Sequence, residues 1–150
     1  MRWVTWEHVG IDRMGSAWLI RRYIDPRAVF HFIPPGTRPS SEQDEGFDIP
    51  GVRFSHHRGH ATFHSLLVQH GIKNPSLDRI ARIIDEADTA QDVFVEPIAQ
   101  GLDAICRGIQ MTSNSDDDAL ERGFMVYDAL LAYLSGDVPT TDSTGPGGHA

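Results

Sequence analysis

The pattern of apolar and polar positions divides the chain into a short N-terminal region of strands and a longer region of helices. Apolar runs rich in strand-forming residues at 3–6 and 28–33 predict two strands, and a further short strand could lie within 47–54. Between the first two strands the spacing is helical over 11–24, and this helix ends at Asp25 because the residue before a proline avoids the helical conformation. Later in the chain the apolar spacing follows the helical period, which predicts helices over 63–70 and 77–88, from Pro97 onward, and from Ser115 to 134.

The order of these elements predicts an α+β fold, a helix-rich single domain with a small N-terminal β-sheet. A chain of 150 residues suits one domain with one hydrophobic core. Hydroxyl side chains are expected to cap the starts of three helices, at Thr62, Ser76 and Ser115. We place the domain at 1–134 and a disordered tail at 135–150, where Gly, Pro, Thr and Ser predominate.

Composition and charge exclude several classes of protein. A net charge of -8 argues against a nucleic-acid partner, since such a surface needs a basic face. No apolar run is long enough for a transmembrane helix, and the N-terminus lacks the apolar stretch of a signal peptide, so no membrane partner is expected. Cys106 is the only cysteine, so no internal disulfide can form and a soluble, cytoplasmic protein is predicted. The oligomeric state is left open, and a homo-oligomer is possible.

Histidines are concentrated in one short segment. Five of the eight lie between residues 56 and 70: His56, His57, His60, His64 and His70. Neutral imidazole is a common ligand for transition metals. His60 and His64 are four residues apart, which places them on one face if the helix begins early, and His57 could point at the same ion from its turn. The alternative is that each histidine is half-buried and hydrogen-bonded without a metal.

Acidic residues follow the apolar stripe of the helix predicted over 77–88. Asp88 falls at the centre of that stripe and Asp85 at its edge, whereas Glu86 is expected to face water. A carboxylate on a core face is costly unless it is paired, hydrogen-bonded or bound to a metal. Alternatively, Asp88 lies at a frayed helix end and caps a nearby group. With histidine ligands, these carboxylates would suit iron, manganese or zinc.

The helix predicted over 11–24 is apolar nearly all round and therefore expected to be buried, yet it carries Arg13 and Arg21. A buried guanidinium needs an anionic partner. One interpretation is an internal salt bridge with Asp12 or Asp25. The other is a positive pocket for an anionic substrate, either an oxyanion or a carboxylate.

The N-terminal segments at 3–5, 10–13 and 16–26 together resemble the opening of the chromate-resistance ChrB-type domain. The resemblance extends over roughly residues 3 to 134, through shorter matches at 54–57, 59, 62–63, 83–84, 87–88, 101–102 and 121–124. It implies a domain associated with chromate resistance, often found behind an N-terminal regulatory region or a sulfurtransferase domain. Such an upstream region is absent from this sequence, so a DNA-binding regulator is not expected.

Two positions depart from the pattern of this family. Where the family tends to have Thr-Phe-Glu, this chain has Thr-Phe-His at 62–64. Where the family tends to have His-Asp-Ala-Asp, this chain has Asp-Glu-Ala-Asp at 85–88, so Asp85 stands in place of the histidine. One position gains a histidine where the other loses one. If positions 64 and 85 face each other, the exchange keeps one histidine and one carboxylate around the same metal.

The sequence therefore predicts one mononuclear site for a divalent transition metal, namely manganese, iron or zinc, in an enzyme that acts on a small anionic molecule. The predicted metal ligands are His57, His64, Asp85 and Asp88. The residues expected to bind the anion are Arg13 and Arg21, and the candidates for proton transfer are His60 and Glu96. Two alternatives remain: a module that senses or sequesters an oxyanion such as chromate around a structural metal, and a structural or partner-binding domain with no metal.

Overall fold

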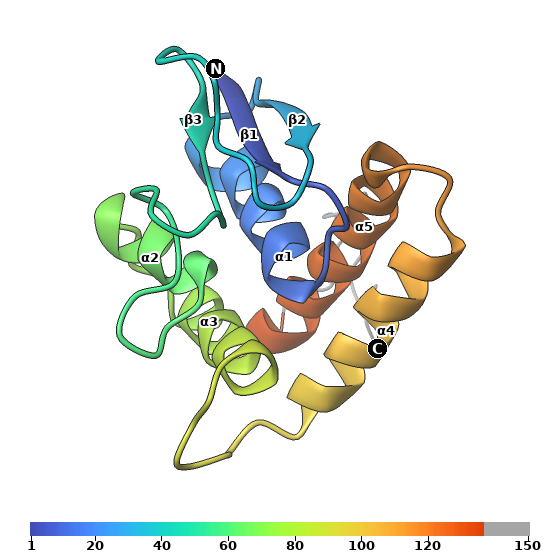
Figure 1. Cartoon of the computed structure of the whole chain (residues 1–150). Coiled ribbons are helices and arrows are strands. Elements are labelled where there is room, and N and C mark those ends of the chain that lie inside the picture. The colour runs from blue at the N-terminus through green and yellow to red at the C-terminus, as the bar shows by residue number, and fades with distance from the viewer. Residues whose placement is uncertain (137–150) are drawn as a thin grey trace, which may run out of the picture.

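The strands of the N-terminal region form a small parallel sheet at one end of the molecule (Figure 1). In the computed structural model, which describes residues 1–136, β1 (Arg2–Trp6) lies between β2 (Val29–Ile33) and β3 (Glu45–Gly46). Both neighbours run parallel to β1. The short strand expected within 47–54 does not form there: β3 precedes it, and that segment contributes a single bridge between Phe47 and Phe54.

Helices make up most of the rest of the chain, and the predicted α+β class is confirmed. The central helix α1 (Ile11–Leu19) continues as a π-helical turn, η1 (Ile20–Ile24), and joins β1 to β2. The later helices in the described part of the chain are α2 (Thr62–Gln69), α3 (Pro75–Asp88), α4 (Ile98–Thr112) and α5 (Asp116–Ser135). Figure 1 shows α2 and α3 on one side of α1 and α4 and α5 on the other, and α1 contacts all four.

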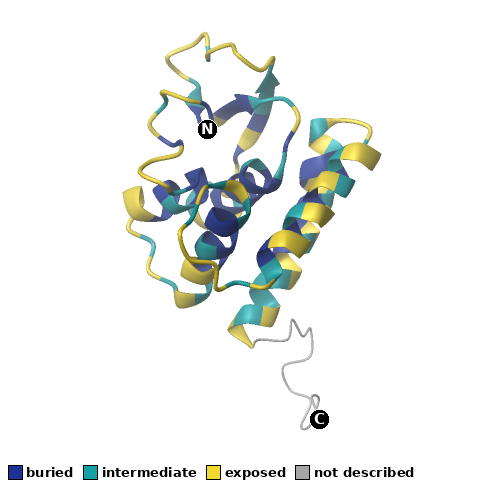
Figure 2. Cartoon of the chain, turned by 60° about the horizontal axis from the view of Figure 1, so that its bottom comes forward, coloured by how far each residue is buried: buried dark blue, intermediate teal, exposed yellow. Residues whose placement is uncertain are grey.

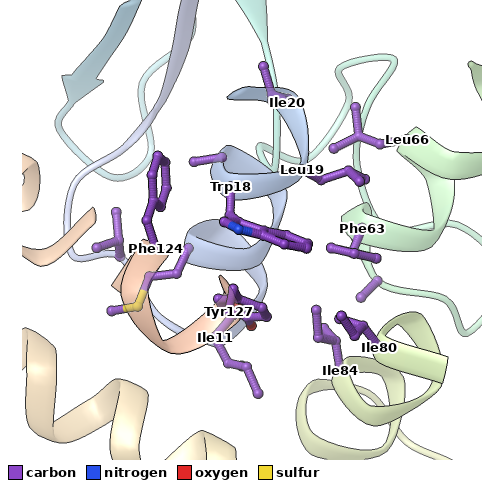
Figure 3. Packing of buried hydrophobic residues seen from close by; sticks show 14 of the residues in the cluster. Ile11, Trp18, Leu19, Ile20, Phe63, Leu66, Ile80, Ile84, Phe124 and Tyr127 are labelled. Carbon is purple, nitrogen blue, oxygen red and sulfur yellow. Dashed lines mark hydrogen bonds between the residues drawn. The ribbon is translucent and has the colours of Figure 1, made fainter. Parts of the chain in front are cut away.

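Aromatic stacking around α1 forms the centre of the core (Figure 3). The fully buried ring of Trp18 stacks on Tyr127 from α5, at 5.5 Å between ring centroids, and on Phe63 from α2, at 6.4 Å. The hydroxyl of Tyr127 donates a 2.7 Å hydrogen bond to the carbonyl oxygen of Ile11. These contacts fix the start of α1 against α5. Figure 2 shows the buried residues gathered on the inward faces of the helices, whereas exposed residues lie on their outer faces and in the loops.

Gly15 allows α1 to approach its neighbours closely. A Cβ atom at this position would lie 2.8 Å from Oη of Tyr127 and 2.9 Å from Cδ1 of Ile84. Real Cβ atoms do not tolerate such distances, so only glycine permits this packing of α1 against α3 and α5.

The helix starts agree only in part with the predicted caps. Ser115 caps α5 as predicted, since its hydroxyl accepts a hydrogen bond from the backbone N–H of Asp118. Helix α3 is capped by Asn74 rather than Ser76 and begins at Pro75, which suits the first turn because it lacks an N–H. The prediction for Thr62 is wrong, because Ala61 occupies the N-cap position of α2 and carboxylates from two other helices bind the free N–H groups.

Within the described residues, no helix has the length and apolar character needed to cross a membrane. Residues 137–150, which make up most of the predicted disordered tail, lie outside the described residues.

Candidate functional site

A cavity of about 430 Å³ opens where the start of α1, two loops and the end of α3 meet. Its charged and titratable lining residues are His8, Asp12, Arg13, Asp48, His56 and Asp88. Three carboxylates, an arginine and two histidines therefore border one space, although they come from four separate segments of the chain.

Asp12 is buried at the start of α1 and is held by the first turn of α2. Its carboxylate accepts hydrogen bonds from the backbone N–H groups of Thr62 (2.9 Å) and Phe63 (3.1 Å) and from the hydroxyl of Ser16 (3.2 Å). Burial alone would raise the pKa of Asp12, but hydrogen bonds from His56 and from these two N–H groups lower it below the ordinary value. Asp12 is therefore a fixed, ionised carboxylate with one oxygen at the cavity.

A second buried carboxylate completes the start of α2. Oδ1 of Asp85, on α3, accepts the N–H of Ala61 at 2.8 Å. Because Asp12 and Asp85 together bind three successive N–H groups, they take the place of the side-chain cap that α2 lacks. This arrangement also fixes the loop before α2, which carries His56.

Asp48 lies in the loop after β3 and has a left-handed backbone (φ 53°). Its Oδ1 accepts a 2.8 Å hydrogen bond from the hydroxyl of Thr62, and its Oδ2 lies 3.1 Å from Nε of Arg13. Burial and the neighbouring charge of Asp12 raise the pKa of Asp48 to about 8, against the opposing effects of Arg13, Thr62 and His56. Asp48 therefore retains its proton at neutral pH unless another cation approaches.

His56 points its Nε2 atom at three carboxylates. The distances are 2.9 Å to Oδ2 of Asp12, 3.5 Å to Oδ1 of Asp48 and 3.4 Å to Oδ2 of Asp88. Hydrogen bonds to Asp12 and Asp88 raise the pKa of His56 to about 10, against partial desolvation. One N–H can donate well to only one of these acceptors, so His56 alone cannot satisfy all three carboxylates.

The distances of 2.9 to 3.5 Å from Nε2 of His56 to these oxygens fit hydrogen bonds and also lie near those between ligand atoms of one metal ion. Two ligand atoms that each lie about 2.1 Å from one ion, at tetrahedral or octahedral angles, are about 3.0 to 3.4 Å apart. One ligand atom each from Asp12, Asp48 and His56 lies within 4.8 Å of the other two. With His56 neutral and Asp48 deprotonated, as metal ligands must be, the three carboxylates and Arg13 leave a local charge of −2. A divalent cation would neutralise that charge.

The predicted metal ligands are divided between two places. Asp88 lines this cavity, whereas His57 and His64 line a neighbouring cavity of about 340 Å³ together with His60. Asp85 lies behind His60, and both of its oxygens have protein donors. The structure therefore separates Asp88 from the other three predicted ligands, and it places the proposed proton-transfer residue His60 with them.

The predicted orientations of Asp88 and Glu86 on α3 are wrong. Asp88, expected at the centre of the buried stripe, has a side chain that is 37% exposed because α3 ends there, whereas the side chain of Asp85 is 4% exposed. Glu86, expected to face water, is buried because it accepts hydrogen bonds from the backbone N–H groups of Val95 and Glu96. Which residues of this helix are buried therefore depends on the loop packed against its end as well as on the helical period.

Of the two predicted anion-binding arginines, only Arg13 borders the cavity. It pairs with Asp48, not with Asp12 or Asp25 as the salt-bridge interpretation suggested, and its terminal nitrogens donate to the backbone carbonyls of Glu7, His8 and Asp48.

Arg21 and Glu96 lie elsewhere. Arg21 donates to the carbonyl of Ala28, and its guanidinium lies over the ring of Phe30, 5.1 Å from the centroid. Glu96 forms a salt bridge with Arg79. Neither residue lines the cavity described above.

Sequence reasoning did not select three central residues of the cavity, Asp12, Asp48 and His56, as candidate metal ligands. A signal existed for Asp12, because a carboxylate in the first turn of a buried helix requires partners. His56 belonged to the recognised histidine segment but lay outside the helical spacing that selected His64. Asp48 lies in an irregular loop, and nothing in its local sequence marks it.

Comparison with known proteins connects the chain with one family. The family model described as ChrB, C-terminal domain matches residues 3–134. Protein ChrB of Cupriavidus metallidurans is 32% identical over 135 residues, which cover 89% of this chain and 41% of that protein. The chain thus spans about two fifths of the length of that relative. No solved structure matches the chain.

Proposed function

This chain belongs to the ChrB C-terminal domain family, and on that premise we propose that its cavity binds one divalent transition metal, which in turn binds a small anion. The resemblance to chromate-resistance proteins favours an oxyanion such as chromate as that anion. The metal ligands are Asp12, Asp48 and His56, with Asp88 as a fourth candidate. In this proposal the metal assists a reaction of the bound anion.

The observation that carries the proposal is the environment of Nε2 in His56. Three carboxylate oxygens lie 2.9 to 3.5 Å from this one nitrogen. In the metal-free protein the protonated His56 and Arg13 supply positive charge among these carboxylates, but the single Nε2–H of His56 can donate well to only one of them. A divalent ion in place of that proton would contact all four groups.

The donor set favours manganese or iron. Three carboxylates and one imidazole supply mostly hard oxygen ligands, which suit manganese, whereas non-haem iron also takes mixed histidine and carboxylate ligands. The hydrogen bonds from Thr62 and Phe63 to Asp12 keep that carboxylate turned toward the cavity, as supporting groups do around metal ligands.

The cavity leaves space for an anion beside the ligands. Its volume of about 430 Å³ exceeds what one metal ion occupies. Arg13 borders this space with a guanidinium whose nitrogens bind Asp48 and backbone carbonyls, so it contributes positive charge while holding the loop of Asp48 in place. We therefore assign Arg13 an electrostatic part in anion binding.

A titration with Mn²⁺ tests this proposal. Protein without a histidine tag is titrated with Mn²⁺, and electron paramagnetic resonance follows the hydrated ion, whose signal weakens on binding. We expect one strong site per chain, weakened about tenfold or more by Asp48→Asn and by His56→Ala. The control is Asp103→Asn, which removes a carboxylate paired with Arg107 on the surface of α4. Equal Mn²⁺ affinity in all four proteins would overturn the proposal.

Equilibrium dialysis against chromate and against sulfate tests the anion. We expect the Mn²⁺-loaded protein to retain chromate and the Asp48→Asn protein to lose most of this capacity. If the metal has a purely structural role, loading the protein with Mn²⁺ should not change the amount of chromate that it retains.

A further inference from the structure

A second cluster of metal-binding side chains lies at the start of α2, outside the first cavity. We propose that His60 and His64 form a separate, nitrogen-rich site for a divalent transition metal such as nickel, zinc or copper. This proposal does not depend on metal binding at Asp12, Asp48 and His56.

Asp85 holds His60 in the orientation of a metal ligand. Nδ1 of His60 lies 2.7 Å from Oδ2 of Asp85, and a carboxylate accepts, so Nδ1 carries a hydrogen and Nε2 is the nitrogen that can offer a lone pair to a metal. Asp85 is itself fixed, because it is buried and its other oxygen accepts the N–H of Ala61. A carboxylate that binds the second nitrogen of an imidazole is the usual support of a metal-binding histidine.

His64 lies directly beside this fixed imidazole. The two ring centroids are 3.8 Å apart, and the rings are inclined by only 15°. Among residues 1–136 no hydrogen bond fixes the ring of His64, so its edge can turn toward Nε2 of His60. Burial, and then the nearby His60, lower the pKa of His64 below its ordinary value.

The surroundings leave room for an ion and for a third ligand. Both rings border a cavity of about 340 Å³ on one side and one of about 230 Å³ on the other. His57 borders the larger cavity, and its backbone forms a reciprocal pair of 2.9 Å hydrogen bonds with the backbone of His60. This tight turn holds the backbone of His57 beside that of His60, which makes His57 the candidate for a third ligand.

The two clusters differ in the ions that they favour. The first cavity offers mainly carboxylate oxygens and suits manganese, whereas His60 and His64 offer imidazole nitrogens, which bind nickel, copper and zinc more strongly. Separate metals can therefore report on each site independently.

The test uses Ni²⁺ and the full chain without a histidine tag. Isothermal titration of Asp48→Asn protein, in which the first site is weakened, should show one remaining Ni²⁺ site. We expect adding His64→Ala or His60→Ala to weaken that site about tenfold or more, whereas adding His70→Gln leaves it unchanged. His70 is a suitable control because it lies at the end of the same helix and its Nδ1 binds the carbonyl of Leu66.

A spectroscopic measurement keeps the test independent of small stability changes. Electron paramagnetic resonance of Cu²⁺ bound to Asp48→Asn protein should show nitrogen couplings from at least two imidazoles, and His64→Ala should remove one of them. Unchanged Ni²⁺ affinity and unchanged nitrogen couplings in the His64→Ala protein would overturn the proposal. Failure of the first site would appear differently, as absent Mn²⁺ binding with Ni²⁺ binding intact.

Discussion

Nε2 of His56 lies 2.9 Å from Oδ2 of Asp12, although the two residues are 44 positions apart in the sequence. The same carboxylate accepts the first N–H groups of α2, so it serves the fold and the cavity at once. Substitutions at Asp12 therefore report on both, and the choice of substitution can separate the two effects.

Asp12→Ala should destabilise the protein by about 3 kcal/mol, because it leaves buried N–H groups of α2 without acceptors. Asp12→Asn should cost less, since its amide oxygen still accepts, yet it should weaken Mn²⁺ binding because the charge is lost. Urea denaturation of the metal-free proteins measures the first effect. Equal stability of Asp12→Ala and wild type would contradict the role assigned to this carboxylate.

The metal-free protein should become less stable as the pH rises. Burial and the charge of Asp12 raise the pKa of Asp48 from 3.8, the ordinary value expected in the unfolded chain, to about 8 in the folded protein. This difference stabilises the folded state fully below the unfolded pKa, and the stabilisation is lost as the pH rises through the folded pKa. The pKa of His56, raised from 6.5 to about 10, extends this loss to higher pH. We expect a decrease of about 1 to 3 kcal/mol between about pH 5 and pH 8.

The matched variant for this pH dependence is Asp48→Asn. Its amide does not titrate, so the free energy of unfolding should change less over the same pH interval, as measured by urea denaturation at each pH. A parallel pH profile in wild type and variant would show that Asp48 does not carry the effect.

Metal binding should release protons. At neutral pH the raised pKa values of His56 and Asp48 mean that both hold a proton in the metal-free protein, and a metal ion displaces it from each. Titration calorimetry with Mn²⁺ in buffers of different ionisation enthalpy counts these protons, and we expect about two per ion at about pH 7. Binding without proton release would place the metal elsewhere.

Gly15→Ala should destabilise the protein by about 2 kcal/mol or more, because the added methyl group meets Tyr127 and Ile84 at distances below 3.0 Å. Gly108→Ala, inside α4 with no atom within 4 Å of the new Cβ, is the control. It should stabilise by about 0.5 to 1 kcal/mol, since alanine favours helices over glycine. Thermal unfolding of both variants checks the contrast, which would fail if Gly15→Ala were neutral.

The elements of the fold could be predicted because each carries its own periodicity. The apolar spacing of α1, α3 and α5 depends only on nearby residues, and the strands β1 and β2 have continuous apolar runs. Strand β3 could not be predicted, since its two residues are strands only through pairing with Trp3 and Val4. The cap of α2 could not be predicted for a similar reason, because the carboxylates that accept its first N–H groups come from α1 and α3.

The candidate site could be predicted only in part. The histidine segment and Asp88 were recognisable, but the helical period placed Asp85 and Asp88 by assuming a helix that continues, and α3 ends at Asp88. Asp48 reaches the cavity because its left-handed backbone and its bond from Thr62 turn it inward. Both features arise from tertiary contacts, which no local pattern encodes.

The most direct test of the proposed metal centre is an anomalous diffraction map from crystals grown with Mn²⁺. We expect one strong peak in the first cavity, within about 2.0 to 2.3 Å of a carboxylate oxygen of Asp12, one of Asp48 and Nε2 of His56. No anomalous peak among these atoms, in crystals whose Mn²⁺ content is confirmed, would contradict the account.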